Sequence, residues 1–180
     1  SLAEQLTKIA KSNNRSIKSL EKGDFIPNAR YYSEPVTVVG RDEWHKRALV
    51  LLKGLDIVFM DPDNGMLVKS VGKRSAKSIK YTFYEEVADY IRQKQSVLIY
   101  NHRSRKQEDA YFRELSEKLV EITGVPESRI LKITFPKCSV RDYLAVPASD
   151  VHRENIKAAF VSMDQGIWGK TGMCRMPRER

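Results

Sequence analysis

The sequence predicts an α/β domain in which a mostly parallel sheet is covered by helices on both faces, in three layers, with a C-terminal antiparallel strand. Short apolar runs that are typical of buried strands alternate with longer segments of helical period. The last two expected strands are joined by a short link, which favours an antiparallel pair. The chain has 180 residues and contains no internal repeat and no low-complexity linker, so a single domain over 1–180 is expected.

The N-terminal half begins with apolar residues at helical spacing over 2–11 and again over 17–20, so residues 1–30 are expected to form a helical extension. A β-branched run over 36–39, between a proline and a glycine, predicts a strand. A helix follows over 42–52, with its first residue, an aspartate, as the N-cap.

Two nearly continuous apolar runs, 55–60 and 96–100, are expected to be strands with both faces covered. A polar, glycine-containing stretch and then a helix over 81–93 separate them. In such sheets ligands bind beyond the carboxyl ends of the strands. The residues that follow these two strands are therefore the first place to look for a site.

The C-terminal half is expected to contain a helix over 106–122, the strands 130–135 and 143–147, and a last helix over 150–162. The tail over 166–180 is expected to be loop-like.

Composition points to a globular and basic protein. Hydrophobic residues make up 41% and charged residues 31% of the chain, which excludes wholesale disorder. The formal net charge of +9 favours a polyanionic partner such as nucleic acid. No apolar run is long enough for a membrane span. Cys138 and Cys174 have no metal-ligand spacing, so two free thiols in a cytoplasmic protein are expected.

Asp61-Pro62-Asp63-Asn64-Gly65 follows the first buried strand and gathers two carboxylates and one amide. Such a cluster can bind an amine, take a proton or hold a divalent metal such as Mg²⁺. Asp61, Asp63 and Asn64 are therefore candidate catalytic residues, and Asp61 and Asp63 are candidate metal ligands. The alternative is a plain turn, because Asn-Gly is a strong hairpin signal and residues 66–68 fit a returning strand.

His102 follows the second buried strand and is the fourth candidate catalytic residue, as a metal ligand, an acid–base group or an anion binder. The alternative is a helix-capping loop. His45 and His152 are expected to be surface or packing residues.

Basic residues follow both candidate loops and are expected to position a phosphate backbone without reading sequence, unless they lie in a solvated loop. Tyr81, Phe83 and Tyr84 are candidates for a base-stacking face, although helical spacing favours the core. The candidate nucleic-acid-binding residues are Lys69, Lys73, Arg74, Lys77, Lys80, Arg103 and Arg105.

Four stretches resemble a family of uncharacterised bacterial and phage proteins: residues 29–35, the DPDNG segment with the strand before it, Lys77-Ser78-Ile79-Lys80-Tyr81, and Gln95-Ser96-Val97-Leu98-Ile99-Tyr100-Asn101-His102. The resemblance covers about residues 15–147. Members have a portion that precedes the first helix here, which implies that this chain is a fragment or a short member.

The order of strand, DPxN, helix and strand is more distantly similar to the second half of the Rossmann-like class I methyltransferases. There a DPPY or NPPY motif follows the fourth strand, and its first residue and the proline backbone hold the target amine. Asp61 and Pro62 match, whereas Asp63-Asn64 replaces the second proline and the aromatic residue that stacks on the base. The resemblance implies S-adenosylmethionine as cofactor, but the glycine-rich loop that binds it is missing.

Three functions remain open at this point. The first is a methyltransferase-like domain that acts on nucleic acid. The second is a metal-dependent nuclease or phosphotransferase that uses Asp61, Asp63 and His102; the acid pair has a local likeness to the DxD of topoisomerase-primase domains, but Glu34, the required earlier glutamate, is too near in sequence. The third is a non-catalytic nucleic-acid or protein-binding module.

Overall fold

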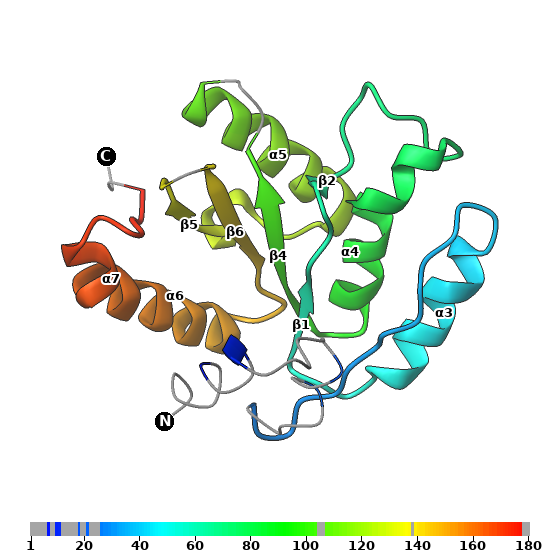
Figure 1. The fold of residues 1–180 in the computed structure, drawn as a ribbon, viewed down its shortest axis with the longest axis horizontal. Helices are drawn as coiled ribbons and strands as arrows, with labels where there is room; N and C mark the ends of the chain where they lie inside the picture. Colours follow the sequence, from blue (N-terminus) through cyan, green and yellow to red (C-terminus); the bar gives the residue numbers. More distant parts are fainter. Residues whose placement is uncertain are drawn as a thin grey trace. The chain divides into compact units, whose positions relative to one another are not determined.

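The computed structural model describes residues 26–103, 107–137 and 139–177, together with residues 7, 10, 11, 18 and 21. The chain groups into two compact units, Ser1–Pro35 and Val36–Arg180. In the first unit residues 7, 10, 11, 18 and 21 are helical, and most of the helical extension predicted over 1–30 lies outside the described residues. All elements named below belong to the second unit (Figure 1).

The centre of the second unit is a four-stranded sheet with the order β1 (Ile57–Met60), β4 (Ser96–His102), β6 (Arg141–Val146) and β5 (Leu131–Phe135). β1 pairs with β4 in parallel, and β6 is antiparallel to both β4 and β5. The predicted α/β class and antiparallel terminal strands are confirmed. The mostly parallel pairing is wrong, because the strand after β5 turns back and inserts between β4 and β5, which leaves one parallel pair in this sheet.

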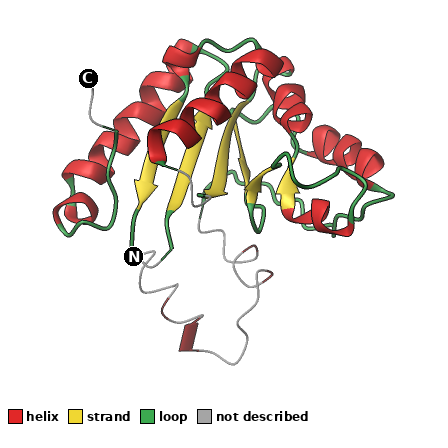
Figure 2. Ribbon diagram, turned by 90° about the horizontal axis from the view of Figure 1, so that it is seen from above, coloured by secondary structure: helices red, strands yellow, loops and turns green. Residues whose placement is uncertain are grey.

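Helices flank the strands in the chain, and Figure 2 shows them packed alongside the sheet. The helices predicted before β1, β4 and β5 and after β6 are confirmed, whereas the predicted loop-like tail contains a short helix, α7. Among the described residues no helix has the length and apolar character that crossing a membrane requires. The helices are α3 (Arg41–Leu51), α4 (Tyr84–Arg92), α5 (Glu108–Thr123), α6 (Asp150–Gln165) and α7 (Ile167–Lys170), with the 3₁₀ turns η1 (Ala76–Lys80) and η2 (Glu127–Arg129).

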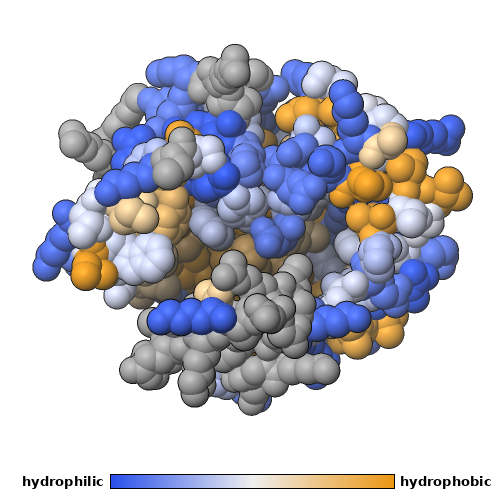
Figure 3. Space-filling model, viewed as in Figure 1, coloured by the Kyte–Doolittle hydropathy of each residue, from blue (hydrophilic) through white to orange (hydrophobic). Residues whose placement is uncertain are grey.

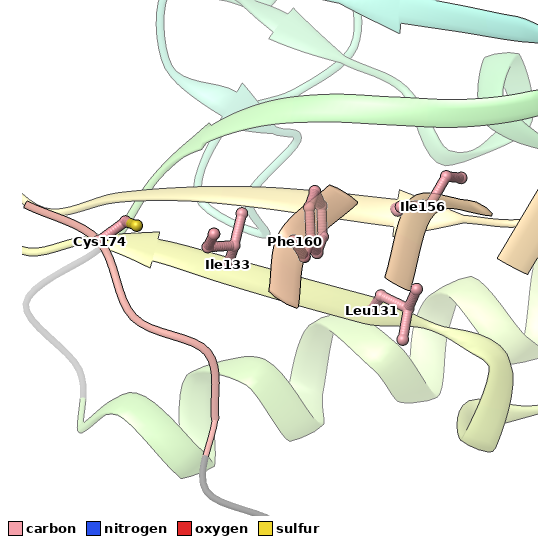
Figure 4. Close-up of a cluster of buried hydrophobic side chains, with 6 residues drawn as sticks. Leu131, Ile133, Ile156, Phe160 and Cys174 are labelled. Atoms are coloured by element: carbon pink, nitrogen blue, oxygen red, sulfur yellow. The ribbon is translucent and has the colours of Figure 1, made fainter. Parts of the chain in front are cut away.

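Opposite faces of the sheet carry different helices. Side chains alternate along a strand, and Asn101 of β4, which bonds to Tyr111 of α5, lies on one face. The other face packs against α6, where buried apolar side chains form a cluster (Figure 4). This cluster consists of Leu131, Ile133, Ala145, Ile156, Phe160 and Cys174.

β1 departs from the sequence prediction because it lies at the edge of the sheet. Val58 is buried, but Ile57 and Phe59, which point to the opposite face, are 43% and 52% exposed. A continuous apolar run predicts a strand with both faces covered, and here one face of β1 is open to solvent. This exposure brings Phe59 to the candidate site described below.

The strand predicted over 36–39 is wrong. These residues form a turn in which the Thr37 hydroxyl accepts a hydrogen bond from the Gly40 amide, and Val39 is 99% exposed. The helix that follows begins at Arg41, with Gly40 rather than Asp42 as its N-cap. Hydrophobic residues gather at the right of the face in Figure 3, where α3 and this turn lie in Figure 1.

A buried ion pair joins α3 to α4. The Arg41 guanidinium bonds to both carboxylate oxygens of Glu86, at 2.6 and 2.8 Å, and both side chains are buried. The same guanidinium donates to the carbonyls of Ser78 and Tyr81. Arg41 therefore holds η1 and the following strand β3 (Tyr81–Thr82) against the helices.

Replacing Glu86 with glutamine is expected to lower the free energy of unfolding by about 3 kcal/mol, because Arg41 would stay charged and buried without a counter-charge. Urea unfolding measures the loss. Glu43→Gln is the matched control, since Glu43 pairs with Lys46 on the exposed side of α3, and its unfolding midpoint should hardly move. Equal losses in the two variants would contradict this role of the buried pair.

Candidate functional site

A polar cavity of about 440 Å³ opens where β1 and β4 end and β6 begins. These strand ends meet because β1 and β4 are parallel and β6 runs the opposite way. The cavity therefore lies beyond the carboxyl ends of the two strands from which the sequence predicted a site. Its lining residues are Phe59, Asp61, Pro62, Asp63, Tyr100, His102 and Tyr143.

The acidic loop is fixed to β4 by one buried amide. Asn101 Oδ1 accepts a hydrogen bond of 3.0 Å from the Met66 amide, and its Nδ2 donates to the Tyr111 hydroxyl at 3.1 Å. Gly65 has a φ of +99°, and a Cβ there would lie 2.2 Å from Asn101 Oδ1. Glycine is therefore required both for the backbone angle and for the close approach of the loop to Asn101.

The loop does not form the hairpin that Asn64-Gly65 allowed. β2 (Gly65–Met66) pairs in parallel with β3, and the Asn64 amide donates to the Lys80 carbonyl at 2.9 Å. The acidic loop is thus hydrogen-bonded to β4 through Asn101 and to the last residue of η1, Lys80.

Asp61 and Asp63 lie on the same wall of the cavity. Partial desolvation and the neighbouring charge of Asp63 raise the pKa of Asp61 above its ordinary value. Asp63 lies 3.5 Å from the Lys80 ammonium group, and both side chains are exposed. The two carboxylates can accept hydrogen bonds from an amine in the cavity. The third polar residue of the loop, Asn64, is not among the lining residues.

Three aromatic rings form the remaining walls. The ring of Phe59 stacks on that of Tyr143 at a centroid distance of 6.2 Å, and Tyr100 meets Tyr143 edge to face at 5.6 Å. None of them was a candidate from the sequence. Strand alternation could have found two, because Phe59 lies two residues before Asp61 and Tyr100 two before His102. Tyr143 depends on the β4–β6 register, which pairs it with Tyr100.

His102 lines the cavity at the end of β4. Its Nε2 is 3.2 Å from the Tyr100 hydroxyl, which also accepts a hydrogen bond from Arg141 Nε. Desolvation and the positive charge of Arg141 lower the pKa of His102, while Asp63 opposes the shift. The imidazole is therefore neutral over a wider pH range than in an unperturbed histidine.

The predicted basic residues fall into two groups. Arg74 and Lys77 are exposed, Lys73 pairs with Glu85 at 2.6 Å, and Lys69 lies 3.5 Å from Glu114. These residues, together with Lys80, form an exposed basic loop that reaches the cavity at Asp63. Arg105 lies outside the described residues.

Arg103 is placed in the interior instead of on a basic rim. Its guanidinium bonds to both oxygens of Asp142 and donates to Glu108. Lys132 and Arg175 also bond to Glu108. Burial alone would raise the pKa of Glu108, but the hydrogen bonds from Lys132 and Arg103 outweigh it and lower the pKa to about 2. Arg103 thus links the end of β4 to β6 and α5 and is not part of an exposed basic rim.

The base-stacking face expected from residues 81–84 is not assembled. Tyr84 is buried, and Phe83 lies under the Arg41 guanidinium, 3.7 Å from its ring centroid. His45 and His152 have packing roles, as predicted. His45 bonds to Asp89 at 2.9 Å, and His152 bonds to the buried Ser96 hydroxyl at 2.8 Å.

Metal binding was a second interpretation of the acid pair. Within the described ranges, no group of three or more His, Cys, Asp or Glu side chains is placed to hold a metal ion. Asp61 and Asp63 would thus need ligands from a substrate or from solvent to complete a coordination sphere.

Comparisons with protein-family models, curated proteins and solved structures give no match. The assignment of function depends on the site itself.

Replacing Gly65 with alanine is expected to lower the free energy of unfolding by about 3 kcal/mol, because the new Cβ combines a strained φ with a clash against Asn101. Thermal and urea unfolding measure the effect. Gly72→Ala is the matched control in the neighbouring loop, where a Cβ meets no atom within 4 Å. A stable Gly65→Ala protein would show that Asn101 does not fix the loop.

The buried charge network predicts a pH dependence. The pKa of Glu108 lies near 2 in the folded chain and near 4.5 when unperturbed, so its contribution to stability is complete above pH 4.5 and is lost as the pH falls toward 2. Glu108→Gln should therefore be less stable than the wild type at pH 7, and the difference should shrink between these two values. Urea unfolding across this range tests it; a difference that does not change with pH would contradict the network.

Proposed function

We propose that this chain is a Rossmann-like, methyltransferase-like domain that acts on nucleic acid, and that the cavity receives an amine-bearing base. The observation that carries the proposal is the meeting of Asp61-Pro62 with three aromatic rings in one cavity. In the methyltransferases that the sequence resembles, the acid and the proline hold the target amine and an aromatic residue stacks on the base. In this chain Asp63-Asn64 occupies the motif positions of the second proline and the aromatic residue. The cavity instead has the rings of Phe59, Tyr100 and Tyr143.

The electrostatics suit the same ligand. The carboxylates of Asp61 and Asp63 accept hydrogen bonds from an amine, and the rings offer apolar faces to a planar base. The exposed basic loop reaches the cavity at its last residue, because Lys80 lies 3.5 Å from Asp63. A phosphate backbone along this loop would be held by charge, while the base in the cavity would be selected by its amine.

S-adenosylmethionine, the cofactor implied by the resemblance, is not fitted by the residues present. The glycine-rich loop that binds it in class I methyltransferases has no counterpart in the sequence. The proposal therefore assigns this chain the acceptor side of the reaction and derives no step of methyl transfer.

The missing cofactor loop favours a second candidate, a non-catalytic nucleic-acid-binding module. This module would use the same rings and the same basic loop. Both candidates use the same acceptor site, and calorimetry with S-adenosylmethionine alone asks whether the chain also holds the cofactor without a glycine-rich loop. Binding would favour the methyltransferase-like domain. A nuclease has less support, because the described residues bring no three metal-ligand side chains together.

Tyr100→Ala is expected to weaken the binding of short single-stranded oligonucleotides about tenfold or more, because base–aromatic stacking contributes about 1–3 kcal/mol. Asp61→Asn should weaken binding when the bases carry amines and have little effect on oligouridine. Fluorescence anisotropy with oligomers of each base measures both. Trp168→Ala, at an exposed ring on α7, is the matched control and should bind like the wild type. Equal affinities of all four proteins would sink the acceptor-site proposal.

A further inference from the structure

The end of β4 and the start of β6 carry a chain of hydrogen bonds across the cavity wall. Arg141 Nε donates to the Tyr100 hydroxyl, and that hydroxyl lies 3.2 Å from His102 Nε2. The register aligns this set, since Tyr100 pairs with Tyr143 and His102 pairs with Arg141. The guanidinium carbon of Arg141 also lies 5.8 Å from the centroid of the Tyr100 ring. Arg141 therefore contacts Tyr100 both at its hydroxyl and at its ring.

The chemistry of these groups gives the chain a direction. Arginine only donates hydrogen bonds, so the Tyr100 oxygen is the acceptor of the first bond. The single proton of that hydroxyl is then available for His102 Nε2, which accepts it when the imidazole is neutral and carries its own proton on Nδ1. Among the described residues, Nδ1 has no hydrogen-bond partner. A neutral His102 in this tautomer keeps one donor for a ligand.

Within the described part of the chain, three neighbours interact with His102 through hydrogen-bonding or charged groups. Tyr100 comes from its own strand, Arg141 from β6 and Asp63 from the loop after β1. Desolvation and Arg141 favour the neutral imidazole, and Asp63 favours the protonated one. Because the net shift of the pKa is downward, desolvation and Arg141 prevail.

We propose that Arg141 is a positioning residue that acts through Tyr100 to hold His102 as the neutral Nδ1–H tautomer. The cavity then presents a hydrogen-bond donor from His102 as well as the acceptors of Asp61 and Asp63. On this proposal the cavity favours a ligand that has an acceptor atom for His102 in addition to its amine. The prediction about the ligand rests on the proposed acceptor site, whereas the tautomer of His102 is a property of the chain alone.

The experiment is ¹⁵N-edited NMR of the histidine side chains in the full chain, followed over a pH titration without ligand. The wild type should show His102 protonated at Nδ1 in its neutral form. Arg141→Gln and Tyr100→Phe should each raise the pKa of His102 toward its ordinary value, because one removes a positive charge and the other removes the bond to the neutral form. Arg141→Lys, which keeps the charge, should leave the pKa closer to that of the wild type.

The signals of His45 and His152 are internal controls, and Arg129→Gln is the matched control for loss of an arginine that pairs with Asp150 instead. An Nε2–H tautomer in the wild type, or an unchanged pKa in a folded Arg141→Gln protein, would overturn the positioning role. An amine-bearing oligonucleotide is then added to the wild type and should shift the Nδ1 resonance. If the wild type shows the Nδ1–H tautomer but the oligonucleotide does not shift its resonance, the positioning role of Arg141 stands and the proposed acceptor site is contradicted.

Discussion

The buried side-chain amide of Asn101 joins three parts of the molecule whose placement determines the cavity. Its oxygen binds the backbone after the acidic loop, its nitrogen binds Tyr111 of α5, and the Tyr111 hydroxyl lies within 3.3 Å of the His102 carbonyl. A buried amide that lost these partners would cost about 1–3 kcal/mol for each polar group left unpaired. These bonds hold the acidic loop in one position relative to β4. Asn101 therefore fixes the loop that carries Asp61, and it is also the residue directly before His102.

The positive charge of the chain is divided between internal and external uses. Arg41 and Arg103 form ion pairs with the buried carboxylates of Glu86 and Asp142, and the buried Lys132 pairs with Glu108. Three carboxylates, those of Glu86, Asp142 and Glu108, balance these three cations, so the buried pairs add nothing to the net charge of +9 and offer no free cation to a partner. Among the described residues, an exposed basic loop reaches the cavity where Lys80 lies 3.5 Å from Asp63, so the local arrangement of charge carries the proposal of a polyanionic partner.

Local patterns in the sequence predicted most elements of the fold but not their pairing. The helices α3 to α6 and the four strands of the main sheet were predicted from apolar patterns, whereas β3 (Tyr81–Thr82) lies where the helix was predicted to begin. The run 36–39 has β-branched residues but no neighbouring strand and remains a turn. The acidic loop and His102 could be predicted to meet because both follow strands. The place of Tyr143 at the cavity and the bond from Arg141 to Tyr100 could not be predicted, since both depend on a register between segments about 40 residues apart. Arg103 looked like a surface cation because its partner Asp142 is equally distant in sequence.

The two edge strands of the sheet, β1 and β5, differ in whether another segment pairs with them. At the β5 edge Thr134 exchanges both backbone hydrogen bonds with Arg175, at 2.9 and 2.8 Å, so the C-terminal segment pairs with that edge at one position. At the other edge the described residues pair β1 with β4 only. An uncovered edge strand is a template for a further strand, and a covered one is not. Among the described residues, the β1 edge, next to the cavity, has no further strand beside it, whereas the β5 edge is paired with the C-terminal segment at Thr134.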